Sequence, residues 1–80
     1  MNKINEDKLK KNFSKILKIK NNKISENLNT KNCEKWDSLA HLNLILSLES
    51  EFKISFDIDK VSKLLSYKLI KLELKKHGVK

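Results

Sequence analysis

The stretch from Leu39 to Phe52 constrains the fold of this chain more than any other feature, because it is strongly apolar within a sequence rich in lysine. A helix over about 38–53 would carry apolar side chains around more than half of its circumference, which is a far wider stripe than a surface helix needs. We therefore expect several neighbouring elements to contact this helix. A narrow polar strip is expected to be its only free face, and it consists of Ala40, Asn43, Ser47, Ser50 and Glu51.

Apolar residues at helical spacing predict three more helices. The first spans about 6–19 and is capped by Asn5 or Asn2, a short one spans about 58–64, and the last spans about 67–77. A long loop that is rich in asparagine and lacks helical periodicity joins the first helix to the second. One glycine and no proline leave few residues for hairpin turns. The 80 residues are thus expected to form a single domain, 1–80, with an all-α, small four-helix bundle fold.

The charge of the chain is unevenly distributed. The net charge is +8 and all 18 basic residues are lysines, yet the segment 33–59 holds two lysines and six acidic residues, a net −4. Sequence-specific reading of bases depends largely on Arg, Asn and Gln side chains, whereas lysine is a strongly hydrated point charge. The lysines are interpreted mainly as a solvated surface. A small basic helical nucleic-acid-binding protein remains the alternative from another functional class, and it predicts binding that weakens steeply with salt.

Other properties bear on compartment and cofactors. Cys33 is the only cysteine, so it cannot form an internal disulfide, and it is interpreted as an inert loop thiol. The chain shows no secretory leader and no apolar run long enough to cross a membrane, so we expect a monomer in the cytoplasm. Neither a metal site nor nucleic-acid binding is expected. His41 is expected to be half-buried within the apolar arc of its helix, and Trp36 to form a partly buried lid over the loop.

Ser38 is the candidate modified residue, because it stands between Asp37 and Leu39 where the apolar helix begins. As an alternative, Ser38 or Asp37 would be a plain helix cap and Leu39 a core residue. A serine hydrolase would need a base and an orienting acid around its nucleophile, usually on a G-x-S-x-G turn. This chain has one glycine and two histidines, so the protein is not expected to be an enzyme.

The motif and its surroundings resemble the acyl carrier proteins over about residues 4–77. The residues that carry the likeness are Trp36-Asp37-Ser38-Leu39, Leu42, Leu44-Ile45-Leu46, Leu48-Glu49, Glu51-Phe52, Ile54 and Phe56. This resemblance implies a four-helix bundle of the acyl carrier type, with Ser38 esterified to 4′-phosphopantetheine by a phosphopantetheinyl transferase that uses coenzyme A. Asp37 and Leu39 would flank the attachment point and be recognised by that transferase. The thiol of the arm would carry an acyl or aminoacyl group as a thioester between biosynthetic enzymes.

The chain departs from the family at positions that are commonly acidic in carriers of fatty-acid synthesis. Those positions are Ala40, Asn43 and Ser50 here. Because electrostatic docking mainly sets association rate and partner choice, their loss predicts a specialised carrier of a dedicated pathway, such as one for a secondary metabolite, a modified sugar or a surface polysaccharide. The candidate docking residues are Ala40, His41, Asn43, Ser47 and Ser50. An aminoacyl or peptidyl carrier, loaded by an adenylating enzyme, is the alternative within the same class.

Overall fold

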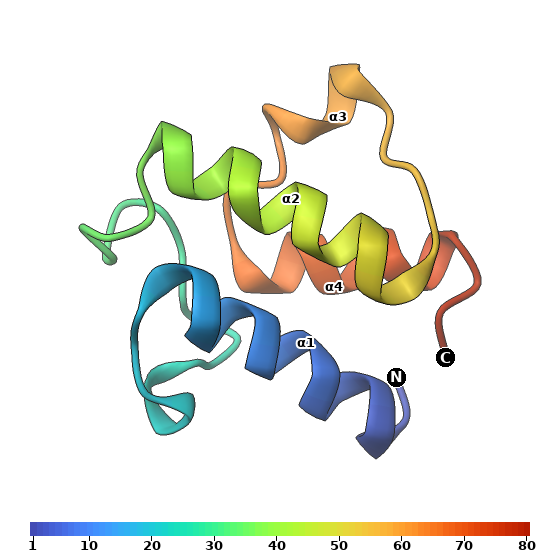
Figure 1. Ribbon diagram of the computed structural model, residues 1–80, viewed down its shortest axis with the longest axis horizontal. Helices are drawn as coiled ribbons and strands as arrows, with labels where there is room; N and C mark the ends of the chain where they lie inside the picture. Colours follow the sequence, from blue (N-terminus) through green and yellow to red (C-terminus); the bar gives the residue numbers. More distant parts are fainter.

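The computed structural model describes residues 1–80 and contains four α-helices and no strand, which confirms the prediction of an all-α fold (Figure 1). The elements in chain order are α1 (Lys3–Leu17), the 3-10 helix η1 (Asn21–Lys23), α2 (Ser38–Phe52), α3 (Ile58–Val61) and α4 (Tyr67–Lys76). None of these helices is both long enough and apolar enough to cross a membrane.

Side-chain caps fix where the three longer helices begin. Asn2 caps α1 by accepting a hydrogen bond from the backbone N–H of Asn5 at 2.8 Å. The helix therefore begins three residues before the predicted Glu6. Ser66 caps α4, accepting from the N–H of Leu69 at 3.1 Å. Each cap satisfies a backbone donor that the first turn of a helix would otherwise leave unpaired.

The third helix is shorter than predicted, because it ends at Val61 rather than at 64. After Val61 the chain tightens into a turn in which Lys63 N–H bonds the carbonyl of Lys60 and Leu64 N–H bonds that of Val61. This turn brings Leu64 into the core while leaving Leu65 exposed. If α3 continued as a helix to residue 64, the chain would keep the direction of α3 and would not turn toward α4.

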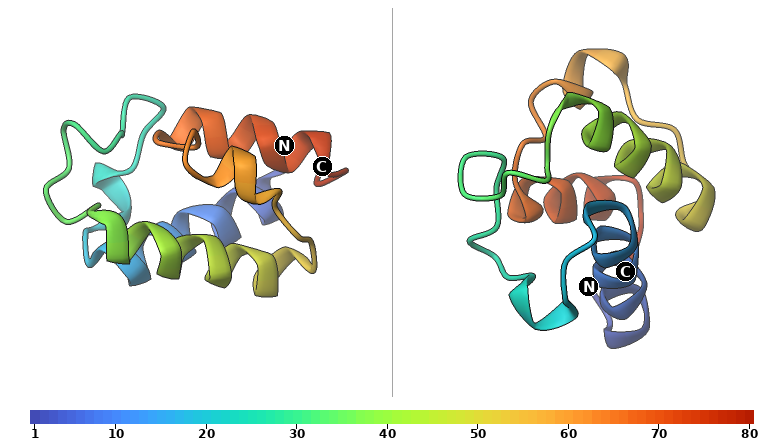
Figure 2. Two further views of the ribbon diagram at one scale, coloured as in Figure 1. Left: turned by 90° about the horizontal axis from the view of Figure 1, so that it is seen from above. Right: turned by 60° about the vertical axis from the view of Figure 1, so that its left-hand side comes forward.

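The core lies between α1, α2 and α4, which surround it in the views of Figure 2. Its fully buried side chains come from all three helices and are Leu9, Phe13, Leu17, Leu44, Leu48, Tyr67, Ile70 and Leu74. Phe13 lies at its centre, with edge-to-face contacts to Trp36 at 5.3 Å and to Tyr67 at 5.1 Å between ring centroids. The helix α3 lies on the outer side of α2, away from α1.

Candidate functional site

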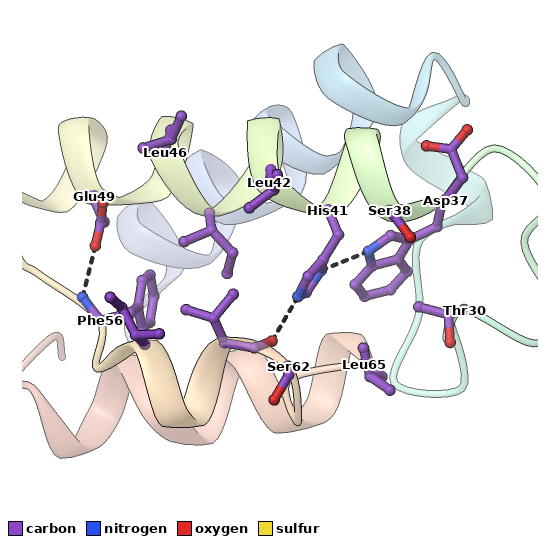
Figure 3. A pocket seen from close by; sticks show the side chains of 14 residues that line it. Thr30, Asp37, Ser38, His41, Leu42, Leu46, Glu49, Phe56, Ser62 and Leu65 are labelled. Atoms are coloured by element: carbon purple, nitrogen blue, oxygen red, sulfur yellow. Dashed lines mark hydrogen bonds between the residues drawn. The ribbon is translucent and has the colours of Figure 1, made fainter.

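A groove of about 940 Å³ lies between α2 and α3 (Figure 3). Eight of its 14 lining residues are hydrophobic. The lining consists of Thr30, Trp36, Asp37, Ser38, His41, Leu42, Ile45, Leu46, Glu49, Phe56, Ile58, Val61, Ser62 and Leu65. Its size and its mostly apolar lining with a few polar groups are typical of small-molecule sites.

Ser38 is the first residue of α2 and lies exposed at one end of this groove. The cap is Asp37, whose carboxylate accepts a hydrogen bond from the N–H of Ala40 at 2.8 Å. Of the two capping alternatives, the structure thus assigns the cap to Asp37 and leaves the hydroxyl of Ser38 outside it. A hydroxyl at this place faces solvent beside backbone N–H groups and the positive end of the helix dipole.

Several elements contact α2, as expected, but its apolar arc is only partly covered, so the expectation that the polar strip is its only free face was wrong. Leu39, Leu42 and Leu46 are 69%, 56% and 63% exposed. The reason is the length of α3, which has four residues and cannot cover the outer side of a 15-residue helix. Leu39 is therefore not a core residue, and the polar strip is not the only free face of α2. Leu42 and Leu46, together with the 88% exposed Ile58 of α3, form the apolar rim of the groove.

Trp36 and His41 are connected by a hydrogen bond near the start of α2. The indole Nε1–H of Trp36 donates to Nδ1 of His41 at 3.0 Å, and Nε2 of His41 lies 2.7 Å from the carbonyl oxygen of Val61. Trp36 is 3% exposed and packs on Phe13, so it is a core residue rather than the predicted lid. His41 is more deeply buried than predicted, and both of its ring nitrogens are paired.

The predicted docking residues do not share one free face. Asn43 and Ser50 are exposed and Ala40 is half-buried. Ser47 is turned toward α1, where its hydroxyl donates to the side chain of Asn12. The ring of His41 points into the groove and is buried there. In this conformation His41 and Ser47 are therefore engaged with neighbouring elements and are not presented to a partner.

Glu49 closes the other end of the groove. Its carboxylate accepts a hydrogen bond from the backbone N–H of Phe56 at 2.7 Å, which holds the connection between α2 and α3 against α2. The ring of Phe56 in turn makes an edge-to-face contact with His77 at 5.7 Å. The structure shows no cluster of three or more His, Cys, Asp or Glu side chains that could hold a metal ion. Cys33 is a free, buried thiol.

Sequence reasoning missed the carbonyl of Val61 and the carboxylate of Glu49 as parts of the site. The first was hidden because the residue contributes a backbone atom, which no side-chain pattern reveals. Glu49 was named only among the residues that resemble the acyl carrier proteins, and no contact was predicted for its carboxylate. One signal could have revealed the buried pair: a donor-only indole at Trp36 lies five residues before an imidazole at His41, on either side of a capped helix start.

Comparison of this chain with models of known protein families finds no match, and comparison with curated protein sequences finds none either.

Proposed function

We propose that this protein is an acyl carrier whose Ser38 hydroxyl is the attachment point of a 4′-phosphopantetheine arm. The observation that carries the proposal is the position of Ser38: an exposed hydroxyl outside the helix cap, at the beginning of α2 and at the open end of an apolar groove. A phosphodiester at this oxygen would be favoured by the helix dipole and by nearby backbone donors. The likeness of the Trp36-Asp37-Ser38-Leu39 segment to acyl carrier proteins supports the same assignment.

The groove fits an arm of this kind. From Ser38 to Glu49 the groove follows α2 for about 16 Å, at a rise of 1.5 Å per residue. Leu42, Ile45 and Leu46 line this path and would cover an apolar chain. In the attachment step the Ser38 oxygen forms a new bond to phosphorus, the nucleotide half of coenzyme A leaves, and the hydroxyl proton passes to a base of the transferase. The thiol of the arm supplies the thioester chemistry, and the protein itself catalyses nothing.

The surface around Ser38 suits partners that recognise apolar side chains. Leu39 is exposed next to Ser38 in the sequence, and Leu42 and Ile58 are exposed in the groove lining. The positions commonly acidic in fatty-acid carriers are Ala40, Asn43 and Ser50 here. Docking that relies on apolar burial depends less on ionic strength than docking that relies on charge. We therefore assign the carrier to a dedicated pathway, with acyl cargo as the first candidate and aminoacyl cargo as the alternative.

The test is intact mass before and after incubation with coenzyme A and a broad-specificity phosphopantetheinyl transferase. The wild type is expected to gain the mass of one phosphopantetheine, and Ser38→Ala is expected to gain none. Ser62→Ala is the matched control, because Ser62 is also an exposed serine that lines the groove but lies after α3. A folded wild type that gains no mass, or a Ser38→Ala variant that gains as much as the wild type, would overturn the proposal.

Two substitutions at Asp37 separate recognition by the transferase from capping. Asn caps helices about as well as Asp, so Asp37→Asn keeps the helix start and removes only the charge, whereas Asp37→Ala also costs about 1 kcal/mol of stability. Slow modification of both variants indicates that the transferase recognises the carboxylate. Slow modification of Asp37→Ala alone indicates that it needs the ordered helix start.

A further inference from the structure

The outward side of α4 combines exposed leucines with lysines. At 3.6 residues per turn, the exposed residues of this helix share an arc of about 120°, opposite the buried Tyr67, Ile70 and Leu74. In the left view of Figure 2, α4 forms one edge of the molecule, with α1 and α2 on its other side. We define the α4 face as these exposed residues together with the exposed leucine just before the helix cap: Leu65, Lys68, Leu69, Leu72, Lys75 and Lys76.

The α4 face carries positive charge that no acid of the protein neutralises. Its three lysines have no carboxylate partner, and no acidic residue belongs to the face. Glu73, the only acid of α4, is buried and pairs with Lys60 at 3.5 Å. Lys71, which lies toward α1, takes up the carboxylates of Glu6 and Glu26. The α4 face is thus a surface of three lysines and three leucines with a charge of +3.

This composition suits an anionic lipid surface better than a protein partner. Protein interfaces are enriched in arginine and aromatic side chains and depleted of lysine, whereas the α4 face has three lysines and neither of the other two kinds. Basic amphipathic helices lie at the boundary between headgroups and acyl chains, with their apolar side chains buried and their lysines near anionic lipids. Lysine stems can also lie along apolar surface while their ammonium groups stay in water.

We propose that the α4 face binds the surface of a membrane that contains anionic phospholipids. Leu65, Leu69 and Leu72 are 42%, 45% and 45% exposed, and they enter the boundary between headgroups and acyl chains while the three lysines contact lipid phosphates. The inference is independent of the proposed function, because Ser38 is not part of the α4 face. Leu65 also lines the groove, so binding would place that side of the groove beside the lipid.

The experiment is sedimentation of the unmodified protein with large vesicles of two compositions. One is phosphatidylcholine alone, and the other is phosphatidylcholine and phosphatidylglycerol in equal amounts. We expect binding at least about tenfold tighter to the mixed vesicles, because each lysine is attracted to an anionic surface. This binding should weaken as sodium chloride is raised, because salt screens the attraction. Equal binding to the two vesicles, or binding to neither, would overturn the proposal.

Two triple variants test whether the charge acts at the α4 face or through the protein as a whole. The first replaces the lysines of the face: Lys68→Gln, Lys75→Gln and Lys76→Gln. Its control replaces three exposed lysines of α1 and removes the same charge: Lys8→Gln, Lys11→Gln and Lys15→Gln. We expect the first to weaken binding to mixed vesicles about tenfold or more, and the control less than about threefold. Equal losses would mean that net charge alone drives adsorption, which contradicts the proposal.

Two double variants test whether the leucines contribute. Leu69→Gln with Leu72→Gln should weaken binding to mixed vesicles at least about threefold, because apolar burial adds to the electrostatic attraction. Leu42→Gln with Leu46→Gln is the matched control on α2, since both leucines are exposed there, and it should leave binding unchanged. No loss in the α4 variant would reject insertion of the leucines. A wild type that forms a dimer in sedimentation velocity without vesicles, and loses it in the α4 variant, would instead assign the face to a second copy of the chain.

Discussion

The two sides of α2 carry the same kind of residue in opposite environments. On the side that faces α1 and α4, Leu44 and Leu48 are completely buried in the core. On the side that faces α3, Leu42 and Leu46 remain mostly exposed above the groove. We call the first the closed side and the second the open side. Two long helices cover the closed side, whereas the four-residue α3 leaves the open side largely uncovered.

Polar contacts follow the same division. On the closed side, the buried Asn12 of α1 bonds the side chains of Ser47 and Glu51 on α2. On the open side, α3 is joined to α2 by the single bond of His41. Since small proteins are stable by only about 5–15 kcal/mol, such a division allows one half of the molecule to provide the stability. The open side then contributes less to that stability.

The largest expected effect comes from truncating one leucine on each side. Leu48→Ala removes a fully buried side chain and should lower the free energy of unfolding by about 2–5 kcal/mol. Leu46→Ala, on the same helix, removes a mostly exposed side chain and should change it by less than about 0.5 kcal/mol. Urea unfolding followed by circular dichroism measures both. Equal losses would show that the open side is packed as tightly as the closed side and would remove the distinction.

The sequence predicted the closed side well and the open side poorly. The spacing of Leu9 and Phe13 defines a single apolar stripe on α1. A single apolar stripe can be buried only by facing the core. The helix α2 is apolar around more than half of its circumference, and periodicity cannot tell a leucine in a core from a leucine at the edge of a groove. That difference depends on the length of α3, which is set by the turn after Val61.

The candidate site shows the same limit. Ser38 was identified because it precedes an apolar helix and follows an acidic residue, both of which are visible in the sequence. The interaction of His41 with the carbonyl of Val61 was not predictable, because it joins residues 20 positions apart through a backbone atom. The docking role predicted for Ser47 was wrong for a similar reason. Its hydroxyl bonds the side chain of Asn12, which lies on another helix and is distant in the sequence.

A second prediction tests whether the polar contact of the closed side is needed for its packing. Asn12→Ala removes the partner of the Ser47 hydroxyl and of the Glu51 carboxylate, and we expect a loss of about 1–3 kcal/mol. Asn43→Ala is the matched control, because Asn43 is an exposed asparagine on α2. Chemical denaturation of both variants gives the values. An equal loss of unfolding free energy in Asn43→Ala and Asn12→Ala would mean that the buried hydrogen bonds of Asn12 add nothing to stability.

A third prediction concerns a defect within the closed side. The hydroxyl of Tyr67 is buried without a hydrogen-bond partner, and its burial raises its pKa to about 12. Tyr67→Phe removes that unpaired group and should stabilise the protein by about 1 kcal/mol. A raised folded pKa gives stability that is complete below the unfolded value of about 10 and is lost as pH rises from there toward 12. Unfolding measured between pH 9 and 12 should therefore show a flatter decline for Tyr67→Phe, and identical declines would contradict the assignment.

The smallest expected effect compares ion pairs on the two sides. On the closed side, the ammonium of Lys71 pairs with Glu6 and, at 3.1 Å, with Glu26, and the hydrogen bond from Lys71 holds the pKa of Glu6 below its usual value. A lowered folded pKa gives stability that is present above the unfolded value of about 4.3 and is lost as pH falls through the folded one. Lys71→Met keeps the apolar stem and removes the charge, so it should cost less than about 1 kcal/mol at pH 7, and the difference from the wild type should shrink below about pH 4.

Lys60→Met provides the matched measurement on the open side. Lys60 has one carboxylate partner, Glu73, at 3.5 Å, and nearly half of its side chain is exposed. Water screens such a pair more than the Lys71 cluster, so we expect thermal unfolding at pH 7 to shift less for Lys60→Met than for Lys71→Met. A larger shift for Lys60→Met would mean that the contact between α3 and α4 contributes to global stability. In that case α3 would unfold together with the core, and the open side would not be an independently mobile part of the molecule.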